Sequence, residues 1–188
     1  MCSRGAVGFW VEGGEIRGGS ATQNVPRNFF LATVRPYQNF ELRVKLRLTG
    51  TGFVNSGVQI RSVRVPNSTE MSGYQVDYGP GWYGKLYDES RRNRVIADSA
   101  DPKAVQAAIK EGEWNEYRIR AEGPRIRSWI NGVPALDYTE AEPDIAQDGR
   151  IGVQVHGGGV ARVEVKEVFI EELSPTPNAP TWEKLGGY

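Results

Sequence analysis

A strict alternation of apolar and charged residues over positions 39–48, NFELRVKLRL, constrains the fold more than any other feature. One face of an extended chain would carry five apolar side chains: Phe40, Leu42, Val44, Leu46 and Leu48. The opposite face would carry four charged ones: Glu41, Arg43, Lys45 and Arg47. A period of two over ten residues predicts a β-strand with one buried face and one solvated outer face.

Similar strand signals recur along the chain. We expect further strands at residues 57–63, 73–78, 83–88, 115–121, 125–130, 133–138, 150–156 and 160–170, with weaker ones at 8–17 and 28–34. Asn131-Gly132 lies between two of them, and this dipeptide accepts positive φ at both central positions of a turn, so it predicts a two-residue hairpin.

One helix is expected. Asp101 can cap it, Pro102 suits its first position, and the run from 103 to 110 consists mostly of good helix formers, with Gly112 as the end. Beyond residue 173 the periodicity stops. We therefore predict one domain over residues 1–173, with its first strand missing or replaced, and an irregular arm over 174–188.

The overall pattern predicts an all-β fold. Many antiparallel strands, one short helix, 23 glycines and 11 prolines suggest a two-sheet antiparallel β-sandwich of the jelly-roll type. A closed barrel is the alternative, because periodicity does not separate the two. A length of 188 residues suits a single domain with a sizeable core.

Composition argues against several functional classes. The formal net charge is zero, which gives no electrostatic reason to bind nucleic acid or an anionic membrane. No apolar run approaches the roughly 18 residues of a membrane span, and no signal peptide is recognisable, although Met1–Arg4 has the look of a trimmed start. Cys2 is the only cysteine, so no internal disulfide can form.

The sequence predicts no metal or other cofactor. A single cysteine and a single histidine argue against a zinc site of the usual kind. A calcium ion held by carboxylates and backbone oxygens is the alternative, but no loop has a recognisable ligand spacing.

Four of the expected strands carry a different polar chemistry from strand 39–48. Their non-core faces combine amides, carboxylates, a phenol, cations and the only imidazole: Gln59, Arg61, Gln75, Asp77, Lys85, Tyr87, Glu89, Gln154 and His156. Side chains of this mixture suit sugar hydroxyls, which need donors and acceptors together. Trp82 and Tyr83 stand nearby and could stack on a sugar ring. We predict that these residues converge on one concave pocket, whereas the competing interpretation is a set of solvent-facing polar positions.

Several strings together resemble one known family. NSGVQIRS (55–62), GYQVDYG (73–79), KLYDES (85–90), EWN (113–115), WINGV (129–133) and GRIGVQVHGGG (149–159) occur in an order similar to that of the 3-keto-disaccharide hydrolase domain. The resemblance covers about Phe9 to Leu173. It implies a concanavalin-like sandwich, export to the periplasm or outside, and cleavage of glycosides whose C3 hydroxyl has been oxidised to a ketone.

The resemblance supplies the substrate, and residue chemistry suggests the roles. A C3 ketone acidifies the C2 proton, so a base can remove it and the C1 substituent can then leave. We assign the base to His156 or Glu89, and the acid to the other of these or to Asp77. Arg61 or Lys85 would stabilise the enolate. Gln59, Gln75, Tyr87, Trp82, Tyr83 and Gln154 complete the predicted substrate-binding set.

Two competing functions remain open at this point. One is a non-catalytic carbohydrate-binding module, which needs stacking aromatics and amides but no tuned acid or base. The other is a structural or interaction domain, which a large exposed apolar patch would favour. For the enzyme and for the carbohydrate-binding module the expected partner is a carbohydrate. The sequence does not indicate an oligomeric state.

Overall fold

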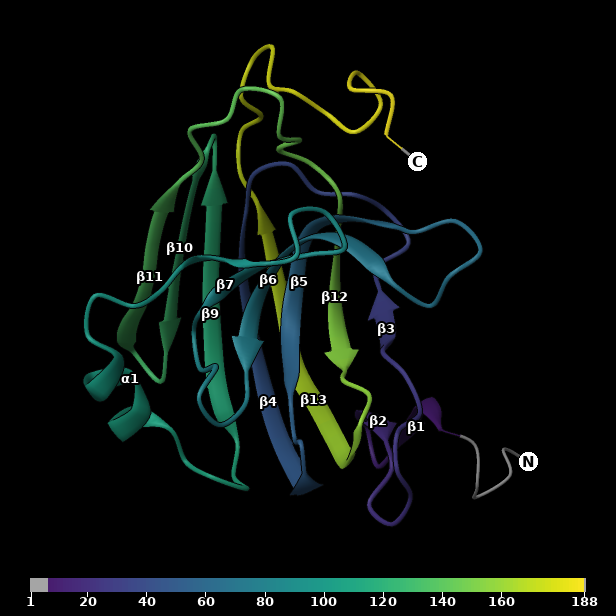
Figure 1. Ribbon diagram of the computed structural model, residues 1–188. Coiled ribbons are helices and arrows are strands. Elements are labelled where there is room, and N and C mark those ends of the chain that lie inside the picture. Colours follow the sequence, from purple (N-terminus) through teal and green to yellow (C-terminus); the bar gives the residue numbers. More distant parts are fainter. Residues whose placement is uncertain (1–6, 188) are drawn as a thin grey trace.

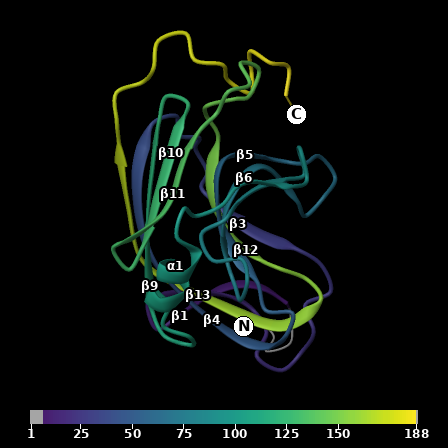
Figure 2. The ribbon, with the colours of Figure 1, turned by 60° about the vertical axis from the view of Figure 1, so that its left-hand side comes forward.

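The computed structural model describes residues 7–187 and shows two antiparallel sheets packed face to face, as Figure 1 and the side view of Figure 2 make plain. The first, called sheet A, has the strand order β1 (Gly8–Glu12), β2 (Glu15–Gly19), β13 (Gly159–Glu172), β4 (Phe40–Gly52), β9 (Asn115–Glu122), β10 (Arg125–Ile130) and β11 (Val133–Thr139). The second, called sheet B, has the order β3 (Phe29–Ala32), β12 (Arg150–Val155), β5 (Ser56–Arg64), β6 (Met71–Tyr78), β7 (Leu86–Glu89) and β8 (Val95–Ala97). The predicted β-sandwich is confirmed, and two separate sheets replace the closed-barrel alternative.

The core lies between the sheets and follows the predicted alternation. On β4, the side chains from Phe40 to Leu48 at every second position are buried against sheet B. Leu42 pairs with Ile119 on β9, and from sheet B Val58 and Ile60 complete the layer. Apolar side chains from both inner faces thus interdigitate, as in aligned sheet packings.

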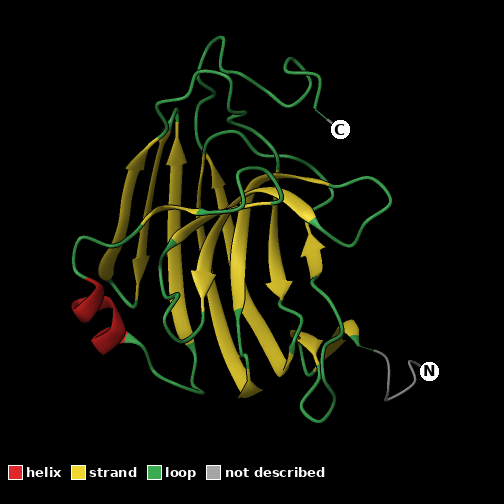
Figure 3. Ribbon diagram, viewed as in Figure 1, coloured by secondary structure: helices red, strands yellow, loops and turns green. Residues whose placement is uncertain are grey.

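Local signals also place the turns and the single helix. Asn131 (φ 49°) and Gly132 (φ 84°) form the predicted hairpin between β10 and β11. Helix α1 (Pro102–Ala108) begins where predicted, because Asp101 Oδ1 accepts a hydrogen bond from the Ala104 amide at 3.0 Å. It ends at Ala108, two residues before the end of the predicted run of helix formers at residue 110. Figure 3 shows how little of the fold is helical.

Two strand predictions need correction. The segment 8–17 contains a hairpin rather than one strand, because Gly13 and Gly14 adopt positive φ between β1 and β2. The strand expected from residue 83 begins only at Leu86, since the Trp82 amide bonds the Gly79 carbonyl and the Lys85 amide bonds the Trp82 carbonyl in successive turns.

After β13 the chain runs across one end of the sandwich without further strands (Figure 1). This segment is nevertheless anchored. Asn39 Nδ2 donates to the Ser174 carbonyl at 2.7 Å, and Trp182 Nε1 donates to the Arg61 carbonyl at 3.0 Å. The start Met1–Arg4, with Cys2, lies outside the described residues.

Arg61 does not share the outward polar face of β5, contrary to prediction. A register irregularity follows Ile60, and Arg61 itself adopts φ 49°, which turns its side chain out of the alternation. The guanidinium is buried and donates to the carbonyls of Gln38 (2.9 Å) and Gly123 (2.7 Å) and to Asn39 Oδ1 (3.1 Å). Burial lowers the pKa of Arg61 to about 10, which leaves it charged at neutral pH. Its observed role is to tie loops together.

Replacing Arg61 should therefore cost stability. Arg61→Leu leaves the carbonyls of Gln38 and Gly123 without the donor that Arg61 supplies, so we expect a loss on the order of 3 kcal/mol in the free energy of unfolding. Chemical denaturation measures it. Arg43→Leu is the control, because that arginine side chain is 56% exposed. Equal stability of the two variants would contradict the structural role of Arg61.

Candidate functional site

A pocket of about 130 Å³ opens on the face of sheet B that points away from sheet A. Its lining residues come from β6, β7 and the segments beside β5, β6 and β12: Phe53, Asn55, Gln75, Asp77, Trp82, Tyr87, Glu89 and His156. Strand register explains the convergence, because Gln75 pairs with Tyr87 and alternates on β6 with the core residues Tyr74 and Val76. The pocket therefore gathers six residues that the sequence predicted for the site.

Two glutamine amides connect the two carboxyl groups of the pocket. Gln75 Nε2 donates to Asp77 Oδ1 at 2.8 Å and to Gln154 Oε1 at 3.3 Å, and Gln154 Nε2 donates to Glu89 Oε2 at 3.2 Å. We call Gln75 and Gln154 the amide bridge. It crosses β5 at Gly57, where a Cβ atom would lie only 2.5 Å from Gln75 Cγ. The glycine is thus what allows the bridge to lie flat on the sheet.

Three buried polar atoms near the bridge have no hydrogen-bond partner among the described residues. They are Gln75 Oε1, Asp77 Oδ2 and Gln59 Nε2. Gln59 faces Gln75 across the β5–β6 pair, is fully buried and does not line the pocket. Because an unpaired buried polar atom costs about 1–3 kcal/mol, this set favours a ligand or ordered water that completes the hydrogen bonds.

Both carboxyl groups hold their protons more tightly than usual. Burial, reinforced by the nearby Glu89 charge, raises the pKa of Asp77 to about 8. Burial, reinforced by the charge of Glu70, raises the pKa of Glu89 to about 7. The amide bridge opposes both shifts, but an amide donor offsets only part of the desolvation of a carboxylate. Each of the two carboxyl groups therefore gains or loses its proton near neutral pH.

His156 is held at the mouth of the pocket just beyond β12. Its backbone amide donates to the Asn55 carbonyl at 3.2 Å, and its ring lies edge-on to Phe53 with centroids 4.8 Å apart. Nδ1 lies 2.6 Å from the Gly157 carbonyl oxygen, which can only accept. Nδ1 therefore carries a hydrogen, and Nε2 is left to take up or release a proton.

Of the two predicted aromatic residues, only Trp82 reaches the pocket. The Trp82 ring stands edge-on to Tyr87, with centroids 6.3 Å apart. The prediction that Tyr83 stands at the pocket is wrong, because successive residues of this turn point to opposite sides. Its ring packs at 5.8 Å from Tyr78 and lines a separate hollow of about 420 Å³.

Lys85 lies beside the pocket without lining it. Its Nζ is 3.7 Å from Asp98 and 5.4 Å from the centre of the Trp82 ring. The ammonium group is thus already engaged outside the pocket. Because Lys85 does not line the pocket, its position does not support the prediction that it binds substrate.

Sequence reasoning missed Phe53 and Asn55. Both precede β5, in a stretch where no alternation indicates the direction of a side chain. Asn55 begins the string NSGVQIRS, which was the one available signal, and it is almost fully buried in the pocket. Phe53 is 44% exposed, so it marks the mouth.

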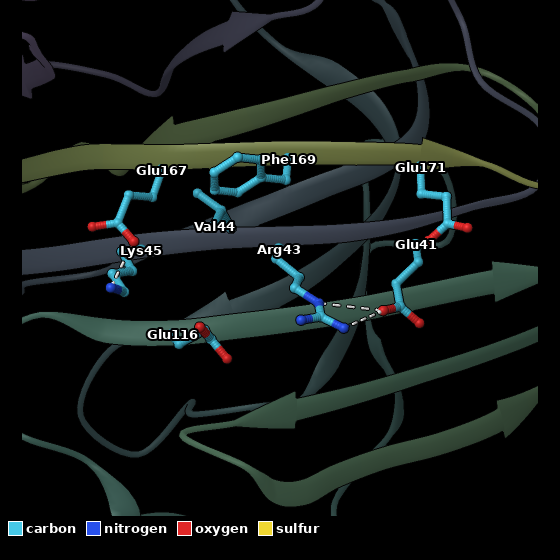
Figure 4. Close-up of a pocket in the computed structure, with 8 residues that line it drawn as sticks. All are labelled: Glu41, Arg43, Val44, Lys45, Glu116, Glu167, Phe169 and Glu171. Carbon is cyan, nitrogen blue, oxygen red and sulfur yellow. Dashed lines mark hydrogen bonds and ion pairs between the residues drawn. The ribbon is translucent and has the colours of Figure 1, made fainter.

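A second hollow, of about 320 Å³, lies on the outer face of sheet A (Figure 4). It is chemically different, because two of its carboxylates, Glu41 and Glu167, are paired with cations. Lys45 Nζ lies 2.6 Å from Glu167 Oε2, and Arg43 lies 3.1 Å from Glu41. Hydrogen bonds from Arg118, the stronger cause, and from Arg43 lower the pKa of Glu41. The hydrogen bond from Lys45 lowers the pKa of Glu167. Both groups stay ionised at neutral pH, so neither can donate a proton there.

Other kinds of site find no support in residues 7–187. No three His, Cys, Asp or Glu side chains of this part of the chain gather as metal ligands would. Nor does any helix within it have the length and apolar character needed to cross a membrane.

Solved structures with the same fold share little sequence with this chain. A carbohydrate-binding module of class 66 from Bacillus subtilis superposes with a TM-score of 0.66 at 16% identity, covering 89% of this chain and 92% of the other. A Bacillus subtilis protein of unknown function with a galectin-like fold gives 0.66 at 10% identity, covering 90% and 88%. A Parabacteroides distasonis protein with a provisional assignment as a glycosyl hydrolase gives 0.65 at 19% identity, covering 89% and 84%.

Sequence comparison is more specific. No curated protein matches the chain significantly. The family model of the 3-keto-alpha-glucoside-1,2-lyase-like domain, in contrast, matches residues 3–171, which is most of the 188 residues. The chain therefore belongs to the family of 3-keto-alpha-glucoside-1,2-lyase-like domains.

Proposed function

We propose that this protein is an enzyme that cleaves 3-keto-glycosides by elimination across C1 and C2, followed by addition of water. One observation carries the proposal. Among the described residues five carboxyl side chains are almost fully buried, and Asp77 is the one of these without an ion-pair partner. Glu89, partly buried beside it, forms no ion pair there either.

Each of the other four buried carboxylates is paired with an arginine. The distances are 2.7 Å for Glu41–Arg118, 2.5 Å for Glu164–Arg47, 2.8 Å for Asp88–Arg91 and 2.7 Å for Glu140–Arg92. Leaving a buried carboxylate without such a cation costs stability. Uncompensated acids that line a pocket with raised pKa values are typical of catalytic sites.

The family supplies a substrate that such groups can act on. In a 3-keto-glycoside the C2 proton is acidified by the ketone. We assign its removal to the Glu89 carboxylate, whose raised pKa makes it a stronger base than an exposed glutamate. The electron pair of the C2–H bond forms the enolate, which re-forms the C3 ketone as a C1=C2 double bond forms and the C1–O bond breaks.

His156 is suited to protonate the departing oxygen. It stands at the mouth next to the exposed Phe53, on the side where a leaving group reaches solvent. Nε2, freed by the Nδ1 contact to Gly157, carries the proton in the imidazolium form. Water then adds at C1 and a proton returns to C2, so the net reaction is hydrolysis. Each step uses groups of this chain and water.

The aromatic rings at the mouth also suit a non-catalytic carbohydrate-binding module. Phe53 and Trp82 can stack on a sugar ring, and a carbohydrate-binding module shares the fold. A binder, however, has no use for a base such as the partly buried, unpaired Glu89. The same sandwich hosts both functions, so the choice rests on the pocket rather than on the fold.

Activity on oxidised substrates tests the proposal directly. A panel of 3-keto-disaccharides and 3-keto-glucosides should be cleaved, whereas the unoxidised parent sugars should not, because their C2 proton is not acidic. Product release is followed by chromatography. Binding of these sugars without turnover of any 3-keto-glycoside would contradict the enzyme and favour the binding module.

Two variants test the assigned roles. General acid–base groups contribute on the order of 10²–10⁴ in rate, so Glu89→Gln and His156→Ala should each lower kcat by at least roughly tenfold. Glu167→Gln, on the far side of the molecule, is the matched control and should keep full activity. Wild-type turnover in both pocket variants would remove these residues from the mechanism.

The same Glu89→Gln variant should be more stable than the wild type at neutral pH. The pKa of Glu89 is raised in the folded state, so between about pH 4.5 and pH 7 the folded protein holds more protons than the unfolded chain. Wild-type stability is therefore lost as pH rises through this window, and the glutamine variant escapes the loss. Thermal melting across this range measures the difference. A constant difference between variant and wild type would contradict the buried, uncompensated carboxyl.

A further inference from the structure

We propose that Asp77, in its neutral form, donates a hydrogen bond from Oδ2 to the C3 ketone oxygen and thereby selects oxidised sugars over their 3-hydroxy parents. The inference rests on the proposed function and assigns Asp77 a role other than protonation of the leaving group. It follows from the position of the carboxyl, from its charged neighbours and from the pattern of unpaired atoms around it.

The position of Asp77 makes one oxygen available and fixes the other. The side chain is 2% exposed and lines the pocket on β6. Oδ1 accepts a hydrogen bond from Gln75 Nε2 at 2.8 Å, whereas Oδ2 is buried and unpaired among the described residues. An amide N–H can bond only to an acceptor, so a proton on the carboxyl belongs on Oδ2.

The charged and titratable neighbours of Asp77 favour retention of that proton. From β7, Glu89 adds a negative charge and Tyr87 is a neutral phenol; from β9, Tyr117 donates its hydroxyl to the Asp77 backbone carbonyl. Lys85 is the nearby cation, and it lies against Asp98. His156 lines the same pocket at its mouth. Burial and the Glu89 charge therefore outweigh Lys85, and the pKa of Asp77 rises to about 8.

The unpaired atoms match a ketone flanked by hydroxyl groups. A ketone oxygen only accepts hydrogen bonds, so a neutral carboxyl suits it and a carboxylate repels it. Next to Asp77, Gln75 Oε1 is a buried acceptor without a partner, and it suits the hydroxyl on a neighbouring carbon. As negative charge develops on the enolate oxygen, the hydrogen bond from Asp77 strengthens, which lowers the barrier as well as selecting the substrate.

Binding of two uncleavable probes tests the proposal. 1,5-Anhydroglucitol and its 3-keto derivative have no leaving group at C1 and differ only in the oxidation of C3. We expect calorimetry to show that the wild type binds the keto probe about tenfold more tightly at pH 6, the worth of one well-placed hydrogen bond. The preference should disappear as pH rises above about 8, where Asp77 loses its proton.

Asp77 variants separate this role from that of a proton donor to the leaving group. Asp77→Asn retains a neutral donor, so it should keep the keto preference, lose its pH dependence and retain much of the turnover. Asp77→Ala should lose the preference. Asp137→Asn, in an exposed ion pair with Arg125, is the control and should behave as wild type. Thermal melting verifies that each variant is folded.

The outcomes distinguish this proposal from the broader function. A wild type that cleaves 3-keto-glycosides but shows no keto preference, or the same preference at pH 6 and pH 9, would overturn the role of Asp77 alone. Loss of the preference in both Asp77→Asn and Asp77→Ala would overturn it as well. A wild type that prefers the keto probe but cleaves no 3-keto-glycoside would refute the proposed reaction and leave the recognition intact.

Discussion

The chemistry of the pocket depends on two carboxyl groups held by amides instead of cations. Asp77 and Glu89 are joined through Gln75 and Gln154, and each raised pKa follows from burial that these amides only partly offset. An arginine in place of either glutamine would stabilise the carboxylates and hold them ionised. The bridge in turn requires four adjacent strands, β12, β5, β6 and β7, and a glycine at position 57.

The two outer faces of the sandwich show that the fold alone does not dictate this chemistry. On sheet A, Glu41 and Glu164 are also nearly inaccessible to solvent, but arginines surround them and lower their pKa values. That face carries charge for stability and solubility. On sheet B the same alternation of strand residues places uncompensated acids in a pocket, at a cost in stability. The difference lies in the residues that neighbour each carboxyl group and in how strongly burial desolvates it.

Strand alternation predicted the strands, the core and most of the pocket, because a period of two fixes which face a side chain occupies. It placed Gln75, Asp77, Glu89 and Gln154 on one face, and their strands are neighbours in sheet B. It failed where the backbone leaves the regular pleat. A bulge turned Arg61 into a loop anchor, and a turn sent Tyr83 to the opposite side from Trp82. The contributions of Phe53 and Asn55 depend on the course of a loop, which periodicity does not describe.

The central claim is that cleavage proceeds through loss of the C2 proton, and the isotopic content of the product tests it most directly. A 3-keto-disaccharide cleaved by the enzyme in D₂O should give a 3-keto-sugar with deuterium at C2, because a solvent proton returns there when water adds at C1. The free product kept in D₂O without enzyme for the same time corrects for spontaneous exchange. A product that retains its original hydrogen at C2 would contradict elimination and indicate direct displacement at C1.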